Sequence, residues 1–128
     1  MRTTPPYRLG SLQLKILKAL WQRKEATVAD LHSALGRRAN LAYVTVATVL
    51  RRMEAKGLVT HRNEERTFVY RASVAENTVA RNMASELVDR VFGGSLAALF
   101  NNLLAHREID PKELVALERL IHEKKGKQ

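Results

Sequence analysis

The chain has 128 residues, of which 45% are hydrophobic, and a formal net charge of +9, which describes one small globular domain or a domain with an appended segment. It contains no cysteine, so disulfides, zinc–thiolate sites and a thiol nucleophile are excluded. No apolar run reaches the ~18 residues of a membrane span, and MRTTPPYRLG at the N-terminus lacks the apolar core of a secretory signal. We therefore expect a cytoplasmic protein without membrane insertion.

The positive charge is concentrated in the first part of the chain. Residues 1–72 contain 14 Lys and Arg against 5 Asp and Glu, a net charge of +9, whereas residues 73–128 contain 8 of each kind. Contacts of Lys and Arg with phosphates dominate the affinity of proteins for nucleic acids. The asymmetry therefore favours a polyanionic partner, and a basic surface that serves only solubility is the alternative.

Two helices are predicted at the start of the basic part. A helical stripe of apolar residues runs from Leu12 to Trp21, with Ser11 as its expected N-cap. A second, shorter helix is predicted from Thr27, which opens a capping-box sequence, to Gly36, a residue typical of helix C-termini.

A third helix is predicted from about residue 42 to residue 56, where Gly57 ends it. Its inward stripe consists of Val46, Val49, Leu50 and Met53. Two β-prone runs follow at 58–62 and 67–71, with a hairpin turn between them. The predicted fold is therefore mainly α, a winged helix-turn-helix of three helices and a β-hairpin wing, whose third helix enters the DNA major groove.

The outward face of the third helix combines small, hydroxyl and basic side chains. Small residues permit close approach to a groove, and threonine methyl and hydroxyl groups suit base edges. The candidate DNA-binding residues of this segment are Ala42, Tyr43, Val44, Thr45, Thr48, Arg51 and Arg52. Arginines of the preceding loop and of the hairpin are candidate phosphate contacts, namely Arg37, Arg38, Arg62 and Arg66. Simple packing of the tyrosine and solvation of the arginine pairs are the alternatives.

Three more helices are predicted in the neutral part, with start signals at Ser73, Ser95 and Asp110. Their long apolar stripes favour a homodimer, and an intramolecular helical extension is the alternative. The predicted dimer interface consists of Val79, Met83, Leu87, Val91, Leu96, Leu99, Phe100, Leu103, Leu114, Leu117 and Ile121. We therefore expect a DNA-binding domain at 1–72 and a helical dimerisation region at 73–128.

Several short segments carry a family resemblance through their order and spacing. They are Leu9–Leu12, Leu20–Trp21, Ala42–Met53, Lys56–Val59, Tyr70 and Phe92–Gly94. With these segments the chain resembles the penicillinase repressor family (BlaI/MecI type) over nearly its whole length. The resemblance implies a homodimeric winged-helix repressor that binds a palindromic operator in double-stranded DNA and whose C-terminal helices interlock. It also implies control of a β-lactamase-type or other stress-response gene set.

The resemblance further implies a route of induction. In the family's β-lactam-responsive members, a membrane sensor protease signals cleavage of an Asn–Phe bond in the helix after the Gly-Gly pair. The matching bond here is Asn102–Leu103, where this chain has Leu in place of Phe. The alternative for Leu103 is a place in the dimer interface. The family's copper-responsive branch uses a cysteine cluster, which this chain lacks.

The predicted function is a DNA-binding transcriptional repressor and not an enzyme. The four histidines show no metal-binding spacing such as H-E-x-x-H, and no phosphate-binding glycine loop or nucleophile elbow occurs. We therefore expect no metal, no cofactor and no small-molecule substrate. The alternatives are a nonspecific nucleic-acid-binding or nucleoid-type protein, which needs no defined outward face, and a module that binds only proteins.

Overall fold

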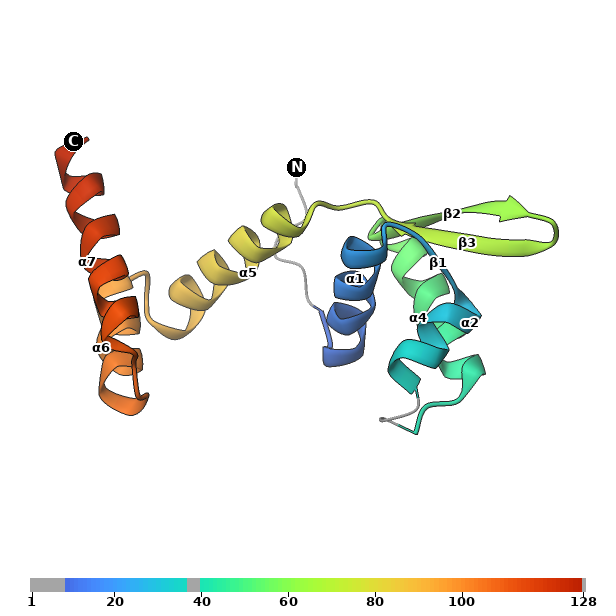
Figure 1. The fold of residues 1–128 in the computed structure, drawn as a ribbon, viewed down its shortest axis with the longest axis horizontal. Coiled ribbons are helices and arrows are strands. Elements are labelled where there is room, and N and C mark those ends of the chain that lie inside the picture. The colour runs from blue at the N-terminus through green and yellow to red at the C-terminus, as the bar shows by residue number, and fades with distance from the viewer. Residues whose placement is uncertain (1–8, 37–39, 128) are drawn as a thin grey trace. The chain divides into compact units, whose positions relative to one another are not determined.

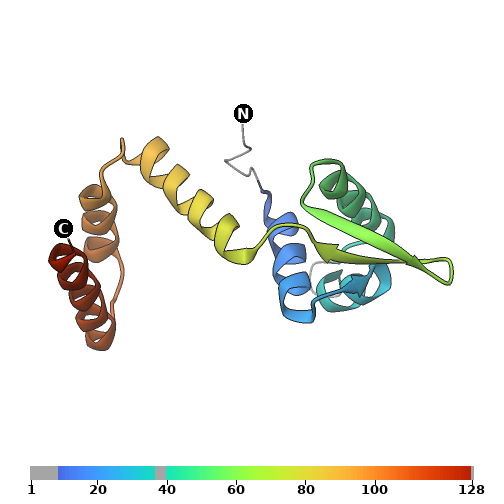
Figure 2. The ribbon, with the colours of Figure 1, turned by 90° about the horizontal axis from the view of Figure 1, so that it is seen from above.

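The computed structural model describes residues 9–36 and 40–127. The chain divides into two compact units, residues 1–85 and residues 86–128. The elements of the first unit are α1 (Ser11–Arg23), β1 (Ala26–Thr27), α2 (Val28–Leu31), the π-helical turn η1 (His32–Gly36), α4 (Tyr43–Ala55), β2 (Val59–Glu64) and β3 (Thr67–Ala72). Helix α5 (Glu76–Val91) crosses the boundary, and α6 (Leu96–His106) and α7 (Pro111–Gly126) complete the second unit. The predicted mainly helical fold with a hairpin wing is confirmed (Figures 1 and 2).

The core of the first unit lies between its helices and its small sheet. It consists of Ile16, Leu17, Leu20, Ala26, Leu31, Val46, Leu50, Met53, Leu58, Val59 and Tyr70. Three residues of the inward stripe predicted for α4 are fully buried, and Val49 packs against the core while partly buried. Burial of this stripe determines which face of α4 is left to solvent, because residues three and four apart share a helix face.

The helix starts follow the expected capping chemistry at α2 but differ from it at α1 and α5. Helix α5 begins at Glu76, two residues later than the cap predicted at Ser73 implies. The backbone N–H of Asp30 donates to Thr27 Oγ1 at 3.1 Å, and that of Thr27 donates to Asp30 Oδ2 at 3.0 Å, which confirms the predicted capping box. Hydrogen bonds from Thr27 hold the pKa of the Asp30 carboxyl below its usual value. At α1 the N-cap is Gly10, whose N–H donates to Gln13 Oε1 at 3.0 Å, so the predicted cap at Ser11 is one residue too late.

The hairpin forms part of an antiparallel sheet with strand order β1-β3-β2. Its register pairs His61 with Tyr70 and Asn63 with Phe68, so these side chains share one face of the sheet. Strand β1 was not predicted. It pairs with β3 through only two residues, which is too short for an alternating pattern to be recognised.

The tip of the hairpin is a tight turn made without glycine. The register pairs Glu64 with Thr67, which leaves Glu65 and Arg66 as the two turn residues. Both have positive φ, 48° and 70°, as a type I′ turn requires. Asn and Gly adopt this conformation at lower cost than Glu or Arg. The wing turn therefore carries backbone strain.

Replacing Glu65 by Asn is expected to stabilise the first unit by about 0.5 kcal/mol, because Asn tolerates the left-handed conformation. The measurement is the free energy of unfolding from urea denaturation followed by circular dichroism. Glu65→Gln is the matched control, since it removes the same charge without the left-handed preference of Asn. Equal stabilities of the two variants would contradict the assignment of strain to this turn.

The first turns of α5 pack on the winged helix. The Trp21 indole N–H donates to the carbonyl oxygen of Val74 at 2.9 Å, and Val79 is only 1% exposed. The compact unit accordingly runs to Ser85, beyond the boundary expected at residue 72. Val79 is already buried within one chain, so it has no exposed apolar area to bury against a second copy. We therefore remove Val79 from the predicted dimer interface.

The two helices that lie wholly in the second unit, α6 and α7, begin at the predicted cap residues. The Ser95 hydroxyl accepts the N–H of Ala98 at 3.0 Å, and the Asp110 carboxylate accepts the N–H of Lys112 at 2.8 Å. Neither helix contains a buried residue in the described chain. The large hydrophobic residues exposed on α6 and α7 are Leu96, Leu104, Leu114, Val115, Leu120 and Ile121. Within residues 9–36 and 40–127, no helix is long and apolar enough to cross a membrane.

Candidate nucleic-acid interface

The predicted DNA-reading residues lie together on the solvent face of α4. Tyr43 is 50% and Val44 69% exposed, although both side chains are largely apolar. Thr45, Arg51 and Arg52 are also exposed. This face therefore presents methyl, hydroxyl and guanidinium groups over the length of one short helix, as a major-groove reader requires.

The N-terminal end of α4 has no side-chain cap. Ala42 is its N-cap residue and cannot provide a side-chain hydrogen bond, so N–H groups of the first turn keep their capacity to bind a phosphate. At mid-helix, the Arg51 guanidinium donates to the Thr48 hydroxyl at 3.4 Å. Thr48 is half-buried, less open than its predicted role in base contact implied.

His32 orients the segment that leads into α4, a role that sequence reasoning missed. Its Nε2–H donates to the carbonyl oxygen of Leu41 at 2.8 Å, and its ring meets that of Tyr43 edge-on at 5.9 Å. A Cβ at Gly36 would lie 2.6 Å from His32 Cδ2, so glycine at this position makes room for the imidazole. Histidine motifs in a sequence indicate metal ligands, so they could not have predicted a hydrogen bond from His32 to a backbone carbonyl.

The two predicted arginines of the wing, Arg62 and Arg66, differ in how readily their guanidinium groups could contact a phosphate. Arg62 is in ion pairs with Glu25 and Glu64, each with 2.9 Å between nitrogen and oxygen, so a phosphate would have to compete for its guanidinium. Glu25 is 37 residues away in sequence, which is why the pair was not anticipated. Arg66 is exposed at the tip of the wing. The predicted loop arginines, Arg37 and Arg38, lie outside the described residues.

A polar and aromatic cluster joins the wing to α4. His61 Nδ1 lies 2.7 Å and 2.9 Å from the two carboxylate oxygens of Glu54, and the His61 ring stacks on Phe68 at 4.0 Å and 19°. The centroid of the Tyr70 ring lies 5.3 Å from that of His61, and burial raises the pKa of the Tyr70 hydroxyl. The alternation of side chains along two paired strands could have predicted that the rings of His61, Phe68 and Tyr70 share one face of the sheet. It could not have predicted that Glu54 of α4 lies beside His61.

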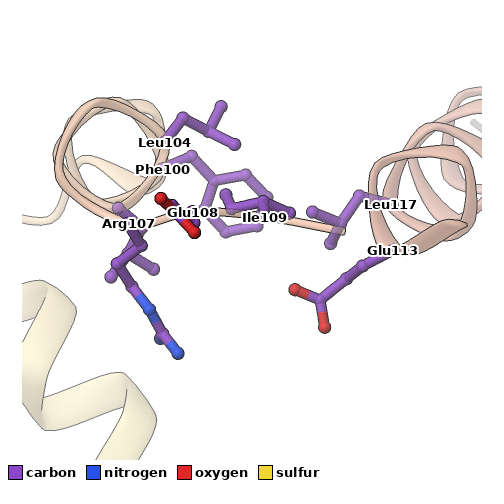
Figure 3. A pocket seen from close by; sticks show the side chains of 8 residues that line it. Phe100, Leu104, Arg107, Glu108, Ile109, Glu113 and Leu117 are labelled. Carbon is purple, nitrogen blue, oxygen red and sulfur yellow. The ribbon is translucent and has the colours of Figure 1, made fainter. Parts of the chain in front are cut away.

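Two recesses in the second unit are lined mainly by apolar side chains. A recess of about 270 Å³ lies between α6 and α7, and the side chains of Phe100 and Ile109 point across it toward Leu117 (Figure 3). A second recess joins Leu96 and Phe100 to Leu120 at the other end of α7. In the described ranges no group of three or more His, Asp or Glu residues could hold a metal ion.

The proposed cleavage bond lies inside α6. Asn102 is exposed and Leu103 is half-buried, and Leu103 lines the recess between α6 and α7. The bond therefore sits within regular helix, and its second residue packs among the apolar side chains of the same unit.

Comparison with known proteins agrees with this geometry. The family model of the penicillinase repressor matches residues 9–123. The penicillinase repressor of Bacillus licheniformis is 22% identical over 121 residues, 94% of each chain. The transcriptional regulator BlaI of Mycobacterium tuberculosis is 44% identical over 64 residues, which cover 49% of this chain and 46% of that protein.

Two solved structures show the same fold. The solution structure of the DNA-binding domain of the repressor BlaI has a TM-score of 0.51 at 25% identity and covers 59% of this chain and 90% of that one. Wild-type MarR from E. coli has a TM-score of 0.52 at 18% identity over 92% of this chain and 79% of that one, a likeness of fold alone. Together with the family match over residues 9–123, these findings confirm the resemblance: the chain belongs to the penicillinase repressor family of winged-helix DNA-binding transcriptional repressors.

Proposed function

We propose that this protein represses transcription as a homodimer bound to a palindromic operator. In this proposal residues 1–72 bind DNA, and exposed apolar faces of the helices that follow pair the two copies. The observation that carries the proposal is the exposed face of α4, where Tyr43 and Val44 stand open to solvent in a strongly basic unit. Neighbouring apolar side chains exposed together are typical of a binding site, whereas apolar side chains exposed singly are common on any protein surface.

Charge supports double-stranded DNA as the partner. The whole net charge of +9 lies in residues 1–72. A helix of 13 residues such as α4 is about 20 Å long, enough to place its small N-terminal residues at base edges and its arginines at the backbone. Sequence-specific reading then falls to Thr45 and Thr48, and orientation to Arg51 and Arg52.

The exposed apolar faces of α5, α6 and α7 support a homodimer. Met83, Leu87 and Val91 recur every four residues along α5, and Leu87 and Val91 are 45% and 65% exposed. Such stripes, left open to water, favour burial against a symmetry mate. The remaining members of the proposed interface are Leu96, Leu99, Phe100, Leu103, Leu114, Leu117 and Ile121. A dimer presents two copies of α4 to two half-sites, which is why a palindrome is the expected target.

Induction by a membrane sensor protease would act through the same unit. Cleavage at Asn102–Leu103 would divide α6 and remove part of the apolar surface proposed for dimerisation. The bond lies in regular helix, whereas proteases act on locally opened, extended backbone. We therefore place any cleavage in a state in which α6 is locally unfolded.

The test is operator binding in competition. A palindromic site is first found by footprinting the promoters beside the protein's own gene. The purified protein should remain bound to this site in a large excess of random duplex DNA, because specific complexes are typically ~10³-fold or more tighter than nonspecific ones. The measurement is fluorescence anisotropy of the labelled site. Equal displacement by specific and random DNA would instead favour the alternative, a nonspecific or nucleoid-type binder.

A further inference from the structure

The backbone of Leu41, which lies directly before the N-cap residue of α4, is held at both of its polar groups by the turn η1. Its N–H donates to the carbonyl oxygen of Gly36 at 2.9 Å, and its carbonyl oxygen accepts a hydrogen bond from His32 Nε2 at 2.8 Å. We call these two hydrogen bonds the Leu41 clamp. Because a carbonyl oxygen can only accept, His32 Nε2 carries a hydrogen whatever the charge of the imidazole.

Gly36 is required by the His32 ring and not by an unusual backbone conformation. The three nearest heavy atoms to a Cβ added at Gly36 all belong to His32, namely Cδ2 at 2.6 Å, Nε2 at 3.0 Å and Cγ at 3.3 Å. Gly36 is not among the described glycines with positive φ, so other residues could adopt its backbone conformation. Any side chain at this position would therefore displace the imidazole and weaken its hydrogen bond to Leu41.

The Leu41 clamp replaces the side-chain cap that α4 lacks. An N-cap side chain ordinarily fixes how the chain enters a helix, and Ala42 cannot provide that hydrogen bond. The clamp fixes the residue before Ala42 and uses only the polar groups of Leu41, so it occupies none of the N–H groups of α4. A helix start that is held in place from outside the helix suits a binding surface, because supporting contacts keep the binding groups in position.

His32 also contacts the first side chain of α4. Its ring and the Tyr43 ring have centroids 5.9 Å apart and an interplanar angle of 72°, which is the edge-to-face geometry that aromatic pairs prefer. Tyr43 is 50% exposed and belongs to the face proposed to read DNA. One imidazole thus contacts both the backbone before α4 and a candidate DNA-binding side chain at its start.

We propose that His32 is a specificity-determining positioning residue, which holds the start of α4 at the base edges through the Leu41 clamp and Tyr43 without touching DNA itself. The inference rests on the proposed function, since it assumes that α4 reads the operator. Base discrimination depends on hydrogen bonds with strict geometry, whereas nonspecific attraction depends on charge. Loss of the clamp should therefore weaken specific binding and leave nonspecific binding intact.

Replacing His32 with Leu removes the donor and keeps a side chain of substantial size. His32→Leu should bind the operator about tenfold more weakly, with unchanged affinity for random duplex and an unchanged salt slope, because no Lys or Arg is lost. His32→Gln should restore most of the discrimination, since its amide can donate to the same carbonyl oxygen. The measurement is fluorescence anisotropy with the operator, with operators that carry one substituted base pair in each half-site, and with random duplex.

Replacing Gly36 with Ala tests the clamp while retaining the imidazole. Gly36→Ala should reproduce the loss seen in His32→Leu, because the added methyl group displaces the ring. In a His32→Ala background, Gly36→Ala should cause no further loss, because the atoms that the methyl group would meet are absent. Gly126→Ala is the matched control and should bind as the wild type does, since a Cβ there meets nothing within 4 Å.

The outcomes separate this inference from the proposed function. Thermal melting shows whether each variant is folded, and Gly36→Ala with its double variant decides the case if His32→Leu is not. Unchanged operator binding by His32→Leu, equal loss on operator and random duplex, or additive losses in the double variant overturns the inference. Nitrogen NMR of the free protein should show the hydrogen on His32 Nε2, and a hydrogen on Nδ1 alone contradicts the clamp. Failure of wild-type protein to prefer any palindrome overturns the proposed function instead.

Discussion

Replacing both Arg51 and Arg52 with glutamine is expected to weaken operator binding about a hundredfold at ~0.15 M salt. Both side chains are exposed on α4, and each is expected to neutralise one phosphate. The slope of log affinity against log salt concentration should therefore fall in magnitude by about two, since each released counterion contributes about 0.9. Anisotropy titrations at several salt concentrations give both quantities.

The matched control is Arg107→Gln with Arg119→Gln. Both residues are exposed in the second unit, and the pair removes the same two charges from the chain. If net charge alone attracted DNA, the two double variants would lose the same affinity and the same slope. The geometry of α4 predicts a large effect for the first pair and little for the second.

Replacing Leu87 with Asp is expected to weaken dimerisation about a hundredfold, because the interface would have to bury an unpaired carboxylate at a cost of about 3 kcal/mol. Leu87 is 45% exposed in the single chain, so the free protomer tolerates the change. Sedimentation equilibrium over a range of concentrations measures the dimer dissociation constant directly.

Ser85→Asp is the control for this substitution. It adds the same charge two residues earlier on α5, where the helical rotation turns the side chain to the opposite, exposed face. Dimerisation should be unaffected there. An unchanged dissociation constant for Leu87→Asp would remove α5 from the interface. Loss of the dimer should also reduce operator affinity, because each protomer would then bind its half-site alone.

The sequence alone determined the features that depend on local physics. Helix starts at Thr27, Ser95 and Asp110 follow from side chains that cap nearby N–H groups, and Gly57 ends α4 with φ of +80°. The face that α4 leaves to solvent follows from the spacing of its buried stripe. These predictions succeeded because each depends on residues at most a few positions apart.

Only the tertiary structure decided the contacts between distant segments. It paired Arg62 with Glu25, placed the His61 ring between Phe68 and Glu54, and buried Val79 within the first unit. Periodicity shows that a residue faces inward or outward, but not which element it meets. Strand β1 is recognised only through its pairing with β3. Such features arise from closure of the chain over long sequence distances, where no local pattern carries the information.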